Sequence, residues 1–209
     1  MLQSAEVLVL KKIPFRESSL VVSGISPDDG RIDFVMKGAQ TVGAKKFPVI
    51  DIFRQVRIDF HPVSDGMPSV YSAESITAFD AIGSHAGNYM LACELGKFAL
   101  DNSSPQLPCP ELCGAMVFVL GALGGSGDAI PTAGQCRLLV RLAYLNENGL
   151  LPEALNADAG KNEMQQRLMA VLLEAAQGDM PLPPLTEDYW QQLEEWSGQL
   201  CRFHGLKMP

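Results

Sequence analysis

Residues 6–39 read EVLVLKKIPFRESSLVVSGISPDDGRIDFVMKGA, and they indicate the fold of the first part of the chain. Three apolar runs, at residues 6–10, 19–25 and 32–36, are short and rich in β-branched side chains, which is typical of β-strands. Between the last two runs, residues 26–30 (SPDDG) supply turn chemistry, because proline presets φ and glycine tolerates a positive φ. The stretch therefore predicts three consecutive strands joined by tight connections.

Two further strands follow. Residues 50–60 (IDIFRQVRIDF) alternate apolar and polar side chains, so that Ile50, Ile52, Val56 and Ile58 share one face. The pair at residues 53–54 breaks this phase, which predicts a bulge or a bend of the kind that a small closed barrel needs. After a Pro/Gly-containing loop, residues 70–79 supply a fifth strand. Five short strands in about 80 residues are typical of an OB-type or another small barrel.

From about residue 81 the apolar spacing becomes three and four, which predicts α-helices. Breaks rich in Gly, Pro, Asn or Ser separate one helix ending near residue 102 from others expected at 110–123, 132–146 and 161–177, and from a last helix that begins near residue 186. The sequence thus predicts an α+β chain, β first and α second. We expect a five-stranded OB-type barrel over residues 1–80 and an all-helical domain over residues 81–209.

The composition indicates a folded protein of ordinary character. Hydrophobic residues make up 47% and charged residues 19% of the 209 residues. No stretch approaches the ~20 uninterrupted apolar residues of a membrane helix, and the N-terminal residues lack the pattern of a secretory signal. We expect a cytosolic protein without a membrane partner. Its five cysteines, odd in number and irregular in spacing, are expected to be free and mostly buried.

No motif in the sequence requires an enzymatic explanation. The glycine-rich run at residues 124–127 lacks the Lys-Ser/Thr pair of a phosphate-binding loop. Cys109 and Cys113 have a spacing that two zinc ligands can adopt, but a structural site needs four ligands, and the three histidines are scattered. We therefore expect no catalytic site, no metal and no cofactor.

Charge is unevenly distributed along the chain. Residues 1–60 hold nine Lys/Arg and seven Asp/Glu, a net charge of +2. Residues 61–209 hold seven Lys/Arg and seventeen Asp/Glu, a net charge of −10. Nucleic-acid binding normally leaves a basic footprint, which only the strand-rich part can supply. Two interpretations stay open at this point. The cations can line a groove that follows a phosphate backbone, or they can simply solvate a surface that is balanced by acids.

The order of elements in residues 6–39 resembles the opening of RecO proteins. In that family a first strand ends in a basic turn with a Gly-Glu-Ser-type element, an acidic residue and Gly form the next turn, and a third strand ends in Lys-Gly-Ala. The matching positions are residues 17–19 (ESS), 29–31 (DGR) and 37–39 (KGA). Residues 137–155 and 200–206 resemble the helical part of the family more loosely.

Two features depart from the family pattern. Many RecO proteins carry two CxxC zinc-binding pairs after the Pro-containing stretch that corresponds to residue 152, whereas residues 152–160 (PEALNADAG) hold no cysteine. The loop that follows Lys37 is usually rich in arginine, and here it reads QTVGA before Lys45 and Lys46. The resemblance therefore implies a RecO protein without the zinc module and with fewer cations in this loop.

The resemblance implies a mediator of DNA repair and recombination. Such a protein binds single-stranded DNA through the barrel, binds RecR and single-strand-binding protein, and promotes strand annealing and recombinase loading in the cytoplasm, at the nucleoid during repair. The alternative is a RecO-like protein-interaction module that has lost DNA binding. Charge location and family likeness together predict a DNA-facing set that consists of Lys11, Lys12, Arg16, Arg31, Lys37, Lys45 and Lys46.

Overall fold

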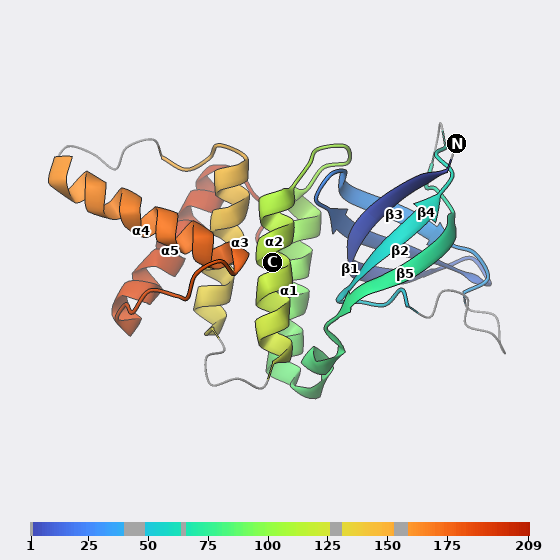
Figure 1. Ribbon diagram of the computed structural model, residues 1–209, viewed down its shortest axis with the longest axis horizontal. Coiled ribbons are helices and arrows are strands. Elements are labelled where there is room, and N and C mark those ends of the chain that lie inside the picture. The colour runs from blue at the N-terminus through green and yellow to red at the C-terminus, as the bar shows by residue number, and fades with distance from the viewer. Residues whose placement is uncertain (1, 40–48, 64–65, 126–130, 153–158) are drawn as a thin grey trace.

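The computed structural model describes residues 2–39, 49–63, 66–125, 131–152 and 159–209, with the strands at one end of the molecule and the helices at the other (Figure 1). Lys45 and Lys46 lie outside the described residues. The strands are β1 (Gln3–Phe15), β2 (Ser19–Ser26), β3 (Gly30–Met36), β4 (Arg54–Phe60) and β5 (Val70–Ala78).

The strands form one antiparallel sheet that closes on itself. Its order is β3-β2-β1-β4-β5, and β3 meets β5 through a parallel bridge between Val35 and Ser69. The Val35 backbone N–H donates to the Pro68 carbonyl at 2.9 Å, which joins the two outer strands. Five strands with this closure form a partly open OB-type barrel, as the sequence predicts.

Side-chain alternation gives the barrel two apolar faces. Val7 and Val9 of β1 point into the barrel interior with Phe34, Val56 and Ile58, all of them buried. The residues between them on β1 point outward, and they are apolar as well: Leu8 and Leu10 pack, together with Ile25 and Phe53, in the same core cluster as the helices. The near-continuous hydrophobicity of residues 7–10 therefore follows from burial on both sides of the strand.

The expected strand at residues 50–60 begins later than predicted. β4 starts at Arg54, because Phe53 has a φ of 59° and turns the chain there. Two hydrogen bonds hold the Phe53 backbone: Phe53 N donates to the Val9 carbonyl at 2.8 Å, and Phe79 N donates to the Phe53 carbonyl at 3.0 Å. The expectation that Ile50 and Ile52 share a face is wrong, since Ile50 packs in the barrel and Ile52 against the helical cluster.

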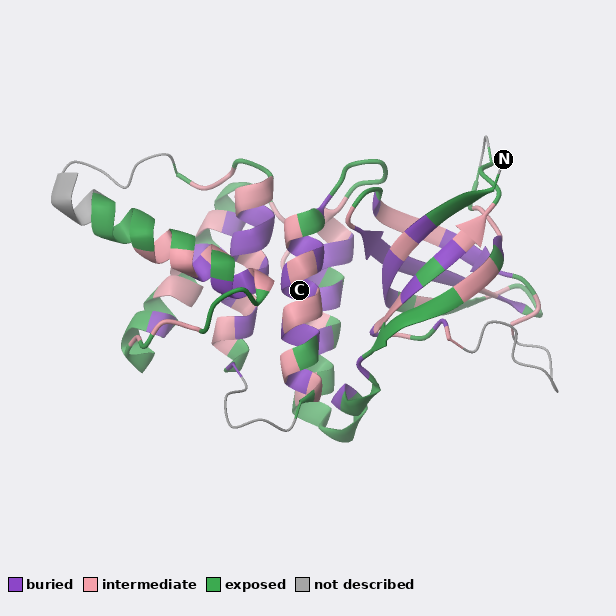
Figure 2. Ribbon diagram, in the orientation of Figure 1, coloured by how far each residue is buried: buried purple, intermediate pink, exposed green. Residues whose placement is uncertain are grey.

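A short 3₁₀ helix, η1 (Asp80–Ser84), leads directly from β5 into the helical part. The α-helices are α1 (Ala86–Asn102), α2 (Pro110–Gly124), α3 (Ala133–Glu147), α4 (Ala159–Gln177) and α5 (Glu187–Phe203), and they confirm the expected helices. α3 packs against α2, α4 and α5. The middle of α3 is largely buried, whereas the first turns of α4 with described side chains are exposed (Figure 2). Within the described ranges, none of the helices has the length and apolar character to cross a membrane.

The barrel and the helices are joined by backbone hydrogen bonds as well as by apolar contacts. The β2–β3 turn meets the α1–α2 connection, where Gln106 N donates to the Asp29 carbonyl at 2.8 Å and Cys109 N donates to the Pro27 carbonyl at 3.0 Å. Arg31 N donates to the Ser104 carbonyl at 3.1 Å. The division into domains at residue 80 remains a proposal, because the two parts share one hydrophobic cluster.

An ion-pair network connects three helices. The Arg137 guanidinium on α3 donates to both carboxylate oxygens of Glu94 on α1, at 2.6 and 2.9 Å, and lies 3.8 Å from Glu194 on α5. These hydrogen bonds hold the pKa of the Glu94 carboxyl below its ordinary value, although burial opposes the shift. A bidentate pair that is about two-thirds buried contributes more to stability than an exposed pair.

Replacing Arg137 with Met is expected to destabilise the protein by about 1–3 kcal/mol at neutral pH, because two carboxylates lose a largely buried partner. A lowered pKa in the folded state means that the stability from Glu94 is present above its ordinary pKa and is lost as the pH falls through the lowered value. The free energy of unfolding of the variant, measured in urea, should therefore approach that of the wild type at acid pH. Arg167→Met, which breaks the exposed Arg167–Glu163 pair, is the control, and an equal loss in both variants would contradict the prediction.

Candidate nucleic-acid interface

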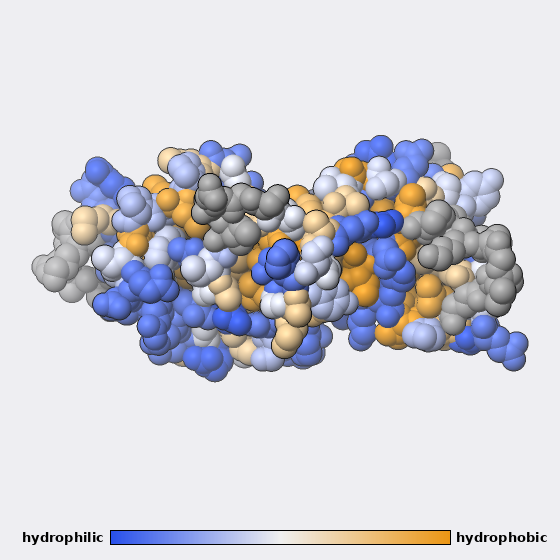
Figure 3. Space-filling view, turned by 90° about the horizontal axis from the view of Figure 1, so that it is seen from below, coloured by the Kyte–Doolittle hydropathy of each residue, from blue (hydrophilic) through white to orange (hydrophobic). Residues whose placement is uncertain are grey.

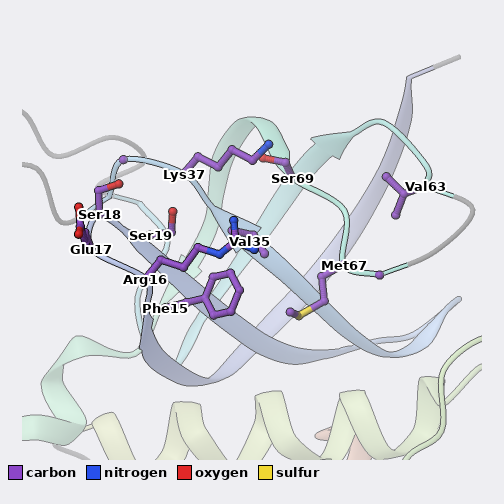
Figure 4. Close-up of a pocket in the computed structure, with 12 residues that line it drawn as sticks. Phe15, Arg16, Glu17, Ser18, Ser19, Val35, Lys37, Val63, Met67 and Ser69 are labelled. Atoms are coloured by element: carbon purple, nitrogen blue, oxygen red, sulfur yellow. The ribbon is translucent and has the colours of Figure 1, made fainter.

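A groove with a volume of about 1060 Å³ lies at the end of the barrel where three segments meet: the β1–β2 turn, the end of β3 and the β4–β5 connection (Figure 4). In OB folds the loops after the first and fourth strands, with the face of strands 2 and 3, bind oligonucleotides. The groove occupies the corresponding place in this barrel. Its lining consists of Phe15, Arg16, Glu17, Ser18, Ser19, Val35, Lys37, Gly38, Val63, Gly66, Met67 and Ser69.

The inner surface of the groove is apolar. Val35 is nearly buried, and its hydrogen bond to the Pro68 carbonyl holds the β4–β5 connection close to β3. That connection contributes the exposed side chains of Val63 and Met67. Phe15, at the end of β1, adds an aromatic ring that is partly exposed. An apolar surface with one accessible ring can accept the face of a nucleobase.

Two cations border this apolar surface. Arg16 lies in the β1–β2 turn with a φ of 54°, and its guanidinium lies 5.1 Å from the centroid of the Phe15 ring. Lys37 follows the last residue of β3 and is exposed. Within the part of the chain that the structure describes, neither side chain forms an ion pair with a carboxylate. Glu17 is the acid that lines the groove with them.

Two other predicted residues lie on the first strand. Lys11 is exposed and stands opposite Ser23 of β2 in the strand register. Lys12 donates to Asp51 at 2.9 Å and to the Ile50 carbonyl at 3.4 Å. Burial raises the pKa of Asp51, but the hydrogen bond and charge of Lys12, the Ile52 backbone N–H and the charge of Arg54 together outweigh burial, so that the pKa lies below its ordinary value. Lys12 is thus neutralised, whereas Lys11 has no carboxylate partner among the described residues.

Arg31 is separated from the groove by the length of β3. Its guanidinium donates to Asp33 at 3.0 Å and to the Leu100 carbonyl of α1 at 3.1 Å. This side chain joins the barrel to the helices and has little capacity left for phosphate. Of the seven predicted DNA-facing residues, the structure brings Arg16 and Lys37 together in the groove and places Lys11, Lys12 and Arg31 outside its lining.

The apolar wall at residues 63–69 was not predicted from the sequence. The segment has the composition of a loop, and its position depends on the long-range contact between β3 and β5. Two apolar residues, Val63 and Met67, in a Pro/Gly-containing loop are the sequence signal that could have pointed to a binding surface, since loop residues that are not needed for packing often carry function.

Four of the five cysteines are buried, and all five are free, as expected. Cys109 and Cys113 lie with their Sγ atoms 3.7 Å apart, and the Cys109 thiol donates to the Ser26 carbonyl at 3.3 Å. Among residues with described positions, no group of three or more His, Cys, Asp or Glu side chains is arranged to hold a metal ion. The arrangement of Cys109 and Cys113 is one of packing between α2 and the barrel.

Comparison with known proteins identifies the barrel. Residues 1–79 match a family model described as recombination protein O N terminal. A comparison with the curated proteins gave no match. The matched range ends within one residue of the end of β5, so that it covers the whole barrel and its groove. The family is one of DNA recombination and repair mediators. Residues 1–79 are therefore similar to the N-terminal domain of recombination protein O (RecO) proteins.

Proposed function

We propose that this protein is a recombination mediator that binds single-stranded DNA in the groove of the barrel. One observation carries the proposal: Arg16 and Lys37 line the same groove as an aromatic ring and several apolar side chains, at the place where OB folds bind oligonucleotides. The two cations contact phosphates, while bases stack on Phe15 and contact Met67. Such binding tolerates any base sequence, because every base has a π-face.

The proposed mechanism includes no covalent chemistry. The strand is held by phosphate contacts and stacking while a competing protein is displaced from it. By family likeness, the partners are RecR and single-strand-binding protein, and the outcome is strand annealing and recombinase loading. From the same likeness we propose that the protein acts in the cytoplasm, at the nucleoid during repair. The protein acts without a catalytic residue, metal or cofactor of its own.

The proposal predicts binding that weakens steeply with salt. A labelled single-stranded oligonucleotide should bind at low salt, and the affinity should fall linearly on a log–log plot with a slope of about −1.4, if Arg16 and Lys37 each neutralise one phosphate. Fluorescence anisotropy across a salt titration measures this directly. Absence of binding at the lowest salt would exclude the groove as a DNA site.

The alternative function is a RecO-like interaction module that has lost DNA binding. The net charge of −10 over residues 61–209 favours it, because this acidic part repels a phosphate backbone. On the face seen in Figure 3, hydrophilic residues cover much of the helical part. The same titration separates the two functions, since an apolar protein contact depends little on salt.

A further inference from the structure

A second apolar groove lies in the helical part, between α4 and α5. Both helices pack against α3, and the opening between them has a volume of about 270 Å³. Leu142, Leu172 and Trp190 form part of the buried cluster on which the lining side chains pack. The apolar lining consists of Leu168 and Met169 from α4 and Tyr189, Leu193 and Trp196 from α5.

The side chains of this groove are of the types that dominate binding energy in protein interfaces. Trp196 is partly exposed and Tyr189 is 36% exposed, so that both rings are accessible. Met164 is 74% exposed and lies one turn before Leu168, which extends the apolar surface along α4. Aromatic residues and methionine are enriched in interface cores, and tryptophan and tyrosine are frequent hot spots.

One rim of the groove is acidic. Asp188 and Glu195 are exposed and lie on one stripe of α5 with Gln192 of the lining, at spacings of four and three residues. Neither carboxylate forms an ion pair with a cation of the described residues. The helix dipole accounts for acids in the first turn of α5, including Asp188. Glu195 lies two turns later, where the dipole gives no such reason.

The neighbouring Glu194 shows the contrast. It faces α3, where Arg137 and Arg141 lie 3.8 and 3.7 Å from its carboxylate. Glu194 is thus paired with arginine, whereas Asp188 and Glu195 are exposed without a cation among the described residues, and Glu195 accepts only a hydrogen bond from Gln191 at 3.1 Å. A partner that buries this groove must bring its own cations, because unpaired carboxylates at an interface are costly to desolvate.

We propose that the α4–α5 groove is a docking site for a basic amphipathic helix of a partner protein. Apolar side chains of that helix enter between Leu168 and Trp196, and its lysines or arginines meet Asp188 and Glu195. The lining of α5 from Tyr189 to Trp196 corresponds to about two helical turns, which suits apolar residues spaced at i, i+3, i+4 and i+7. This proposal is independent of DNA binding by the barrel.

The chain carries a reporter for the test. Its two tryptophans are Trp190, which is buried, and Trp196, in the groove. In the variant Trp190→Phe, with its fold checked by circular dichroism, emission comes from Trp196 alone. The probe is a designed helical peptide with leucine on one face and lysine on the other. Titration of this peptide should change the Trp196 emission to saturation, and calorimetry should give the same affinity.

Two double variants with the same charge change test the acidic rim. Asp188→Lys with Glu195→Lys should weaken binding of the Leu/Lys peptide about tenfold or more. Glu163→Lys with Glu174→Lys changes exposed acids on the opposite face of α4 and should leave the affinity within about twofold.

Several outcomes would overturn the proposal. They are no binding, an equal loss in both double variants, equal affinity for a scrambled Leu/Lys peptide, and equal affinity for a Leu/Glu peptide of the same pattern. A further overturning outcome comes from light scattering and fluorescence quenching together. If the protein alone forms a dimer, and the dimer shields Trp196 from a soluble quencher, the groove is occupied by a second copy. None of these outcomes bears on the salt titration with DNA.

Discussion

Replacing both Arg16 and Lys37 with glutamate should weaken binding of single-stranded DNA about a hundredfold at low salt. It should also reduce the magnitude of the slope of log affinity against log salt by about 1.4. The two cations border one apolar groove without a carboxylate partner in the described residues, so that they are available to phosphate. Reversal removes two favourable contacts and adds two repulsive ones. Anisotropy with a labelled oligonucleotide across a salt series measures both the affinity and the slope.

The matched control is Lys97→Glu with Arg167→Glu, which gives the same charge change on α1 and α4. Both side chains are largely exposed, at 60% and 78%. If binding depends on the groove, this control should keep most of its affinity, whereas a similar loss in both variants would show that only the overall charge matters. Neither change touches the core, so both proteins should unfold at the wild-type temperature within about 2 °C.

Replacing Gly30 with Ala should destabilise the protein by about 3 kcal/mol or more and lower its melting temperature by about 10 °C. Gly30 starts β3 with a φ of +67°, a conformation that side chains rarely adopt. A Cβ atom there would overlap the carbonyl oxygens of Ser104 and Leu107. These are backbone atoms of the α1–α2 connection, so the overlap can be relieved only by moving the barrel away from the helices.

The control for Gly30 is Gly149→Ala. Gly149 has a φ of +64°, and no atom lies within 4 Å of the position that its Cβ would take. This variant carries the backbone strain without the overlap and should cost about 1 kcal/mol. Thermal unfolding by circular dichroism compares the two. Equal losses would mean that the contact between the β2–β3 turn and the α1–α2 connection adds nothing to stability.

The elements that depend on local sequence could be predicted, and those that depend on distant contacts could not. The turn at residues 26–30 is local, and so is the start of α3 at the expected position, where Thr132 accepts from the Gln135 backbone and the Gln135 side chain accepts from Thr132 N. The break at Phe53 was predicted from the loss of alternation. Its consequence was not, because the hydrogen bond from Phe53 to Val9 joins residues far apart in sequence.

The candidate site shows the same division. A list of basic residues treats Lys12, Arg31 and Lys37 alike, since the sequence does not show which carboxylates lie near them. In the folded chain Asp51 neutralises Lys12, and Asp33 neutralises Arg31. Lys37 differs because it follows the end of a strand, at the edge of the groove. Pairing across the fold decides which cations remain for a ligand.

The shared core and the hydrogen-bonded contact between the β2–β3 turn and the α1–α2 connection have a mechanical consequence. Because η1 begins two residues after the end of β5, this connection is too short to let the barrel rotate freely relative to the helices. The DNA strand proposed for the barrel and the helix proposed for the α4–α5 groove would therefore be held at a constant separation and orientation. A complex that occupies both proposed sites would gain avidity only where its two contacts match that spacing, so that the length of the molecule would then contribute to selectivity.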